Sequence, residues 1–183
     1  MKPLLTFGIA AIIYALTTPI AFATCLPNSL YITRHAEKQD EKNNHDPNLS
    51  EQGQARAQRI ADILADVNIN HLFSTPYNRT KQTLAPLSQH KNLVITEYDP
   101  REQDTFIHQI KNNYCNQTLV IAGHSNTVPS ILQDLGIHFN VSLGKYRFNY
   151  QPSIILSEHE FGQLFLIHFN QDTPILEILS SDS

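Results

Sequence analysis

The sequence predicts an α/β protein with a mainly parallel central sheet between two layers of helices. Short apolar segments typical of buried strands occur at residues 30–33, 93–97 and 118–122. They alternate with segments whose apolar residues recur every three or four positions, as on one face of an amphipathic helix. This alternation is typical of βα units, whose strands pair in parallel and whose helices cover both faces of the sheet. The expected architecture is a three-layer α/β/α sandwich.

The first half of the chain begins with the predicted strand Leu30–Thr33. A polar loop follows over Glu37–Asn48, and Ser50 is a suitable N-cap for the first helix. The apolar face of this helix consists of Ala57, Ile60, Ala61, Leu64 and Val67. Residues 68–73 lead into a second strand, and another helix begins near Arg79. The buried side of the second helix is expected to consist of Thr80, Thr83, Leu84 and Leu87.

The second half continues the same alternation. A third strand is predicted at Leu93–Glu97, a helix at Thr105–Asn113 and a fourth strand at Thr118–Ala122. Pro129 fits the first turn of a further helix, which Gly136 closes. Three more strands are expected, at Tyr146–Leu156, Gln163–Phe169 and Pro174–Leu179.

The N-terminal segment is typical of a secretory signal peptide. Leu4–Ala23 carries no charge, follows the single cation Lys2 and ends in the small-x-small pattern Ala21–Ala23. An uncleaved membrane anchor is the alternative, since twenty residues are enough to span a bilayer, but Thr17–Pro19 weaken that span. We therefore expect residues 1–23 to be a cleaved signal peptide and 24–183 to form a single domain. The expected location is periplasmic or secreted, with no stable membrane span after cleavage.

The charge balance disfavours nucleic acid as a partner. The full chain of 183 residues has 13 Lys and Arg against 17 Asp and Glu, a net charge of −4. No run of basic residues could neutralise a phosphate backbone. A small anionic substrate stays compatible with this composition, because a pair of arginines can dominate the field of its own pocket.

Two cysteines, Cys25 and Cys115, remain after the predicted cleavage. Each lies a few residues before a predicted strand, so the two would meet at one edge of the sheet if these strands are parallel neighbours. Export to an oxidising compartment then favours a disulfide, with two unpaired thiols as the alternative. Neither their spacing nor any Asp, Glu or His cluster indicates a metal site, and we expect no metal and no cofactor.

Ligands of such sheets bind beyond the carboxyl ends of the strands, and polar residues follow four of these ends. They are Arg34-His35, Ser74 to Arg79, Tyr98 to Glu102, and Gly123 to Asn126. One Arg-His pair at a strand end is usually only the start of a polar loop. Four compatible groups at one edge indicate a site.

Phosphoryl transfer through a phosphohistidine is the chemistry that this set of residues favours. A neutral imidazole attacks phosphorus directly, while arginines hold the phosphate oxygens with forked donors. A second histidine adds another donor, and a protonated carboxylic acid supplies a proton to the leaving oxygen. Arginine and imidazolium provide the stabilisation that Mg²⁺ gives in other phosphoryl-transfer enzymes.

Four segments resemble motifs of the histidine phosphatase superfamily, which has the phosphoglycerate mutase-like fold. Arg34–Glu37 resembles the Arg-His-Gly signature, with Ala36 in place of Gly, and Leu49–Ala57 resembles the start of the first helix. Ser74–Thr83 resembles the second arginine motif and Gly123–Ser125 the second histidine motif. The four occur in the family's order and cover about residues 30–135. The resemblance points to the small exported phosphatases of the family.

The resemblance implies that His35 is the nucleophile and that Arg34, Arg79 and His124 bind the phosphoryl group. Ser125 stands where one branch of the family has its acidic proton donor. The donor is therefore expected in the loop after the third strand, as in the other branch. Candidates there are Asp99, then Glu102, then Glu97. Thr75 is a further candidate for phosphate contact, and Asn126 either contacts substrate or caps a helix.

The predicted function is a metal-independent phosphomonoester phosphatase. The connection Tyr98–Asn116 leaves no room for the lid that a mutase requires. The expected partner is a small phosphorylated substrate, with a sugar or cell-envelope phosphate suggested by resemblance to small exported members. A non-catalytic phosphate-binding module on the same fold is the alternative. His45-Asp46 is expected to be solvated, and the histidines outside the motifs are expected to be surface or structural residues.

Overall fold

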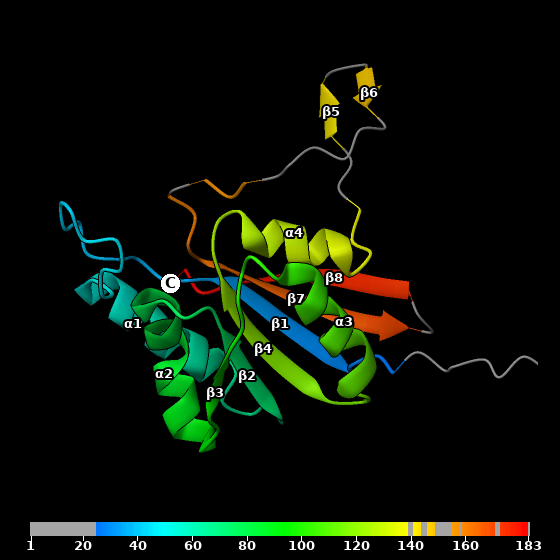
Figure 1. Ribbon diagram of the computed structural model, residues 1–183, viewed down its shortest axis with the longest axis horizontal. Helices are drawn as coiled ribbons and strands as arrows, with labels where there is room; N and C mark the ends of the chain where they lie inside the picture. Colours follow the sequence, from blue (N-terminus) through cyan, green and yellow to red (C-terminus); the bar gives the residue numbers. More distant parts are fainter. Residues whose placement is uncertain are drawn as a thin grey trace, which may run out of the picture.

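The computed structural model describes residues 25–138, 141–143, 146–148, 155–157, 159–170 and 173–182 (Figure 1). The predicted signal peptide, residues 1–23, lies outside the described residues. No helix in the described part of the chain is long and apolar enough to cross a membrane.

Strands and helices alternate through the first two thirds of the domain. The elements there are β1 (Ser29–Arg34), α1 (Glu51–Ile63), β2 (His71–Ser74), α2 (Asn78–Lys91), β3 (Ile95–Glu97), α3 (Gln103–Asn113), β4 (Thr118–Gly123) and α4 (Thr127–Asp134). The remaining elements are β5 (Val141–Leu143), β6 (Tyr146–Phe148), β7 (Gln163–Asn170) and β8 (Thr173–Ser180). Ser50 caps α1 as predicted, because its Oγ accepts a hydrogen bond from Gly53 N at 3.1 Å.

The central sheet has six strands in the order β3-β2-β4-β1-β7-β8. The pairs β1–β4, β2–β4 and β2–β3 are parallel, while β7 and β8 run antiparallel to their neighbours. The prediction of a mainly parallel sheet is confirmed. Arg34 at the end of β1 lies opposite Gly123 at the end of β4. Consequently the two residues that follow, His35 and His124, leave the sheet next to each other.

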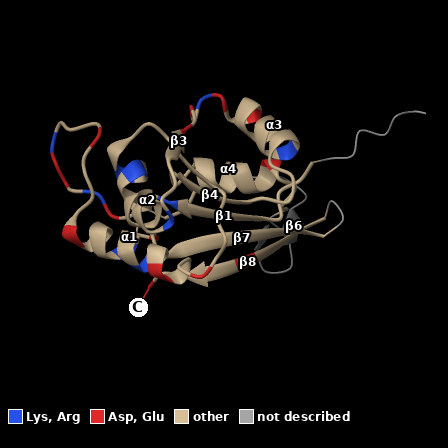
Figure 2. Cartoon of the chain, turned by 90° about the horizontal axis from the view of Figure 1, so that it is seen from below, with Lys and Arg blue, Asp and Glu red and all other residues tan. Residues whose placement is uncertain are grey.

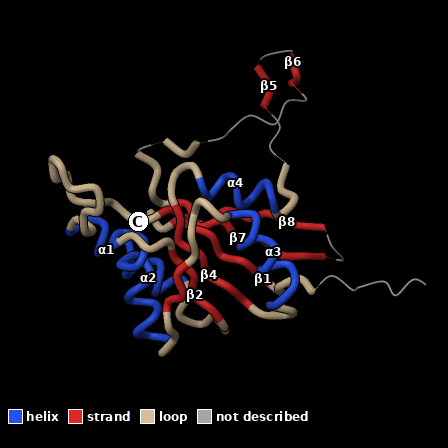
Figure 3. Tube along the Cα trace, in the orientation of Figure 1, coloured by secondary structure: helices blue, strands red, loops and turns tan. Residues whose placement is uncertain are grey.

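Helices cover both faces of this sheet (Figures 1 and 3). Leu30 and Ile32 of β1 pack with α3 and α4, whereas Tyr31 between them packs with α1 and α2. Successive side chains of a strand point to opposite faces, so a strand covered on both sides must be apolar throughout. This explains the unbroken apolar runs of β1 and β4. It also establishes the expected three-layer sandwich.

The prediction of one strand over Tyr146–Leu156 is wrong in part. β6 ends at Phe148, and residues 155–157 are not in a strand, while residues 149–154 lie outside the described residues. The short partner strand β5 was not expected. Leu156 N donates a hydrogen bond to Ser125 O at 2.9 Å. This segment therefore runs along the loop after β4 instead of pairing with a strand, which its apolar composition alone could not reveal.

The structure contains the disulfide Cys25–Cys115, with the two Cα atoms 4.6 Å apart. Cys25 precedes β1 and Cys115 precedes β4. Since these two strands are parallel neighbours, the bond lies at the amino-terminal edge of the sheet, opposite to the edge where His35 and His124 emerge.

We expect the variant Cys25→Ser/Cys115→Ser to be less stable than the wild type by about 2–4 kcal/mol. The bond closes a loop of 90 residues, and losing it restores the conformational entropy of that loop in the unfolded chain. Urea unfolding of the variant, and of the wild type with and without a reductant, checks this expectation. Equal stability of all three would show that the bond does not constrain the unfolded chain.

Candidate active site

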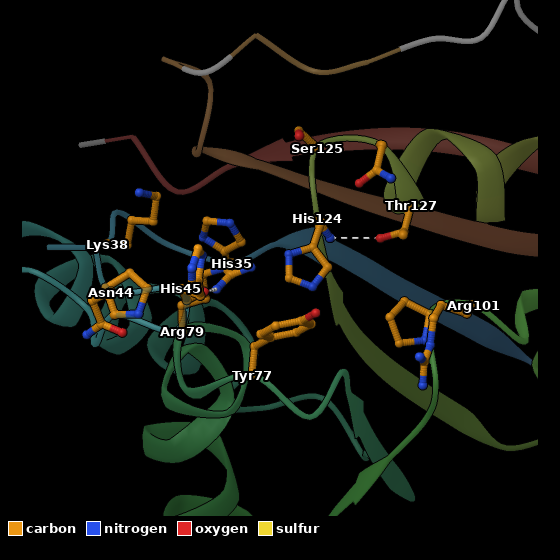
Figure 4. A pocket seen from close by; sticks show the side chains of 13 residues that line it. His35, Lys38, Asn44, His45, Tyr77, Arg79, Arg101, His124, Ser125 and Thr127 are labelled. Atoms are coloured by element: carbon orange, nitrogen blue, oxygen red, sulfur yellow. Dashed lines mark hydrogen bonds between the residues drawn. The ribbon is translucent and has the colours of Figure 1, made fainter. Parts of the chain in front are cut away.

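A polar pocket of about 560 Å³ opens at the carboxyl ends of the parallel strands. His35 and His124 lie in it, with Tyr77 and Arg79 from the start of α2 beside them (Figure 4). The long loop between β1 and α1 forms one wall, and the loop after β3 contributes Arg101 to the other. The first of these loops carries acidic and basic residues and extends away from the sheet (Figure 2). The pocket is therefore assembled from residues that follow four strands, β1, β2, β3 and β4.

The His35 imidazole is held in one tautomer. Its Nδ1 lies 2.8 Å from the carbonyl oxygen of Ala36. A carbonyl oxygen only accepts, so Nδ1 carries the proton and Nε2 keeps its lone pair. The backbone N–H of His35 donates to Gly123 O at 2.9 Å, and the side chain is 4 % exposed. His35 is thus a fixed, neutral imidazole with one nitrogen available as a nucleophile.

Burial lowers the pKa of His35 to about 3, and the nearby His124, Arg34 and Arg79 contribute to this lowering. Burial likewise lowers the pKa of His124 to about 4, again with help from Arg79 and Arg34. The two imidazole rings are 5.4 Å apart between centroids. Both histidines are therefore uncharged near neutral pH, although they lie among cations.

Arg34 is buried and anchored by a segment near the C-terminus. Its Nη1 donates to the carbonyl oxygens of Ser157 at 2.7 Å and Glu160 at 3.3 Å. Its guanidinium carbon lies 4.2 Å from the centre of the Phe161 ring, and that ring is 6.0 Å from the His35 ring. These contacts fix the guanidinium beside His35. No motif pointed to Phe161, because it lies about 125 residues from Arg34 in the sequence.

Arg79 enters the pocket from the first turn of α2. Its guanidinium lies over the ring of Tyr77 at 4.4 Å, and its Nη1 is 3.7 Å from Asp46 Oδ1. Its Nε is buried and has no hydrogen-bond partner among the described residues. The same Asp46 oxygen accepts from Asn78 N at 2.8 Å. Asp46 therefore positions α2 against the loop, which differs from the expectation that His45-Asp46 is only solvated; His45 itself lines the pocket.

Thr75 and Thr80 form the support behind His124. Thr75 Oγ1 is 2.9 Å from His124 Nε2 and 2.8 Å from Thr80 Oγ1. Both threonine side chains are fully buried. Thr75 contacts the second histidine and is not among the described residues that line the pocket, so its predicted contact with phosphate stays a prediction. Asn126 does line the pocket.

None of the three predicted carboxylates is among the described residues that line the pocket. Asp99 accepts two hydrogen bonds from the Arg101 guanidinium, at 3.0 and 2.7 Å, which lower its pKa to about 2. Glu97 pairs with Lys81 at 3.1 Å, and Glu102 is exposed at the start of α3. No carboxylate is among the described residues that line the pocket. As a proton donor, Asp99 would have to leave Arg101 and turn inward.

A buried ion pair holds the loop that follows His35. Glu37 accepts hydrogen bonds from Nε and Nη2 of Arg56, with the shortest at 2.7 Å. Nη1 of Arg56 contacts Asp182 at 2.7 Å and Ser181 at 3.1 Å. Gly53 lies so close to the Glu37 backbone that a Cβ at this position would collide with Glu37 O. One arginine of α1 thus connects the loop after β1 to the C-terminal residues.

The described part of the chain contains no group of three or more His, Cys, Asp or Glu side chains that could hold a metal ion. The residues that the structure does gather at the pocket are imidazoles and guanidiniums, the donor set suited to an oxyanion.

Comparison with known proteins agrees with this geometry. The sequence model of the histidine phosphatase superfamily (branch 1) matches residues 30–105, which include Arg34, His35 and Arg79. A search of curated protein sequences finds no match.

Solved structures share the fold. A protein from Agrobacterium tumefaciens named for the phosphohistidine phosphatase SixA is 21% identical, with a TM-score of 0.59 over 84% of this chain and 98% of its own. A mycobacterial glucosyl-3-phosphoglycerate phosphatase, solved with inorganic phosphate, is 11% identical, with a TM-score of 0.57 and the same coverage. SixA with tungstate is 14% identical, with a TM-score of 0.55 over 84% of this chain and 97% of its own.

Residues 30–105, less than half of the chain, are thus similar to the histidine phosphatase superfamily (branch 1). The predicted fold is confirmed.

Proposed function

We propose that the protein is a metal-independent phosphomonoester phosphatase that acts through a covalent phosphohistidine on His35. The observation that carries this proposal is the tautomer of His35. Its proton is held by Ala36 O, so the Nε2 lone pair is available for attack on phosphorus. Its lowered pKa keeps that lone pair unprotonated at any physiological pH.

The surroundings of His35 support phosphate binding by Arg34, Arg79 and His124. The buried Nε of Arg79 has no partner among the described residues, and a buried polar group of this kind is stabilised when an anion binds. Two structures of this fold hold tetrahedral oxyanions, inorganic phosphate in one and tungstate in the other. We infer that the phosphoryl group lies between these three side chains.

The substrate that we propose is a small phosphate ester, such as a sugar or cell-envelope phosphate. A pocket of about 560 Å³ admits a molecule of that size. The proposed location is periplasmic or secreted, which agrees with the disulfide. One relative of the same fold is named for a phosphorylated sugar acid, glucosyl-3-phosphoglycerate.

Hydrolysis of 4-nitrophenyl phosphate by residues 24–183, with and without EDTA, tests the proposal. Equal turnover under both conditions, with a phosphoenzyme trapped by rapid quenching, is the expected result. Binding of phosphate without turnover of any ester would instead identify the non-catalytic phosphate-binding module.

We expect kcat/KM to stay high down to about pH 4 and to fall below it. The free enzyme needs a neutral His35, and a pKa lowered to about 3 means that protonation removes the nucleophile only at lower pH. A pH profile of kcat/KM with 4-nitrophenyl phosphate measures this loss of activity at low pH. Half-loss of activity near pH 6.5, the ordinary value for histidine, would contradict the buried environment of His35.

A further inference from the structure

Cleavage of an alkyl phosphate requires a proton for the leaving oxygen, and the described residues place no carboxylic acid in the pocket to supply it. No carboxylate is among the described residues that line the pocket, and Asp99 is held by Arg101. The ionisable side chains that line it include two histidines from strand ends, His35 and His124. His35 is committed to attack on phosphorus, since its Nδ1 proton is bound to Ala36 O.

The hydrogen bonds behind His124 determine where its proton lies. Thr80 Oγ1 is 2.8 Å from Tyr77 O and 3.0 Å from Thr75 O, and carbonyl oxygens only accept. Thr80 therefore donates its hydroxyl proton to a carbonyl oxygen, and its Oγ1 accepts a hydrogen bond from Thr75 Oγ1 at 2.8 Å. Thr75 has then used its own proton, so at the 2.9 Å contact it accepts from His124 Nε2.

This chain of donors fixes neutral His124 as the Nε2–H tautomer. Its Nδ1 then carries a lone pair, and no hydrogen bond joins Nδ1 to another described residue. The side chain lines the pocket (Figure 4) with its ring 5.4 Å from that of the nucleophile. A neutral nitrogen in this position accepts a proton from the substrate monoanion or from water, and returns it when charge develops on an oxygen.

We propose that His124, acting through Nδ1 and oriented by Thr75 and Thr80, is the general acid and base of the reaction. This inference rests on the proposed phosphatase function. It gives His124 a proton-transfer role in addition to phosphate binding, and it takes the role of donor away from Asp99.

The proton balance of the two steps is complete without another group. In the first step His35 Nε2 bonds to phosphorus, the bond from phosphorus to the leaving oxygen breaks, and that oxygen takes the proton from His124 Nδ1. In the second step a water oxygen bonds to phosphorus, and the electron pair of the N–P bond returns to Nε2. The water proton passes to His124 Nδ1, which releases it with the phosphate product.

The charges around His124 suit both directions of transfer. The ionisable groups that face it are Arg34, His35, Asp46, Tyr77 and Arg79. In the empty pocket, burial and the two arginines lower its pKa to about 4, so it is ready to accept a proton. A bound phosphate adds negative charge beside the ring and favours the imidazolium that the first step consumes.

A pair of substrates with different leaving groups tests the inference. The wild type, His124→Asn and Asp99→Asn are compared on glycerol phosphate, whose alkoxide needs protonation, and on 4-nitrophenyl phosphate, whose phenolate does not. We expect His124→Asn to lower kcat/KM far more for glycerol phosphate than for the aryl ester, with about a 10²–10⁴-fold difference between the two losses. A role confined to phosphate binding would lower both values equally.

The threonine behind the histidine provides a matched pair of variants. Thr80→Val removes the acceptor for Thr75, which frees the Thr75 proton to donate to His124 Nε2 and moves the imidazole proton to Nδ1. We expect the ratio of the alkyl to the aryl rate to fall by roughly threefold to tenfold, the effect of one hydrogen bond. Thr80→Ser keeps the hydroxyl and should restore the ratio, which a simple loss of packing would not predict.

The inference is overturned if His124→Asn lowers both substrates alike, or if the selective loss follows Asp99→Asn or Asp46→Asn instead. Circular dichroism of each variant establishes that it is folded. Failure of the proposed function has a different signature, namely a wild-type protein that cleaves neither ester or does so without a phosphoenzyme.

Discussion

Replacing His35 with alanine will lower kcat for 4-nitrophenyl phosphate by about 10⁴-fold or more, the range seen when a nucleophile is removed from an enzyme. The remaining imidazole of His124 cannot take over the attack. Its Nε2 is bound to Thr75, and in the proposed reaction its Nδ1 transfers protons. The covalent phosphoenzyme should disappear together with turnover. The fold should not change, because the variant removes one ring and leaves the Ala36 carbonyl free to bind water.

His90→Ala is the matched control for this variant. His90 is exposed in the last turn of α2, at the end of that helix opposite to Arg79. It should retain wild-type turnover and the same phosphoenzyme. Rapid acid-free quenching after mixing with a ³²P-labelled ester, followed by gel separation, measures the covalent species in all three proteins. Turnover or labelling that survives in His35→Ala would show that another residue is the nucleophile.

The second large effect concerns stability. Arg56→Met is expected to reduce the free energy of unfolding by about 3–5 kcal/mol, because it leaves the Glu37 carboxylate buried without its partner. The side chains of Arg56 and Glu37 are only 7% and 13% exposed. The variant also removes the contacts to Ser181 and Asp182. Urea unfolding of the variant and the wild type at pH 7 measures the difference.

The double variant Glu37→Leu/Arg56→Met separates the lost charge pair from lost packing. Replacing both partners with apolar groups removes the unpaired charge, so the double variant should recover most of the stability. Burial raises the pKa of Glu37, but the hydrogen bonds and charge of Arg56 outweigh burial and leave this pKa lowered. The stabilisation is thus complete above the ordinary value for glutamate and is lost as the pH falls through the lowered one. A defect in Arg56→Met that is unchanged at low pH, or a double variant as unstable as the single one, would contradict this account.

The fold was predictable because its strands are buried on both faces. Leu30–Thr33 and Thr118–Ala122 are continuously apolar for that reason, and the helices between them show a clear three-to-four residue period. The proximity of His35 and His124 followed from the same topology, because parallel neighbours end at one edge. Their roles were suggested by resemblance to a family, and the structure adds the tautomers that make those roles chemically reasonable.

The residues that could not be predicted act through contacts distant in sequence. Phe161 stacks on Arg34 from the C-terminal part of the chain, and Asp46 reaches α2 from a loop that is polar throughout. The prediction of Asp99 as proton donor depended on position in the chain alone. Asp99 pairs with Arg101, only two residues away. An Asp and an Arg at this spacing also occur in ordinary solvent-exposed turns, so the sequence did not indicate the pairing.

The disulfide has a consequence for how this protein could be modified. Its two cysteines tie together the starts of β1 and β4, while the candidate active site lies where the same strands end. The stabilising disulfide and the candidate active site therefore lie at opposite edges of the same sheet. Engineering for a longer working life can concentrate on the rim with the sulfur bridge, by shortening loops or attaching the protein to a support there, with the reacting rim left open to its substrate.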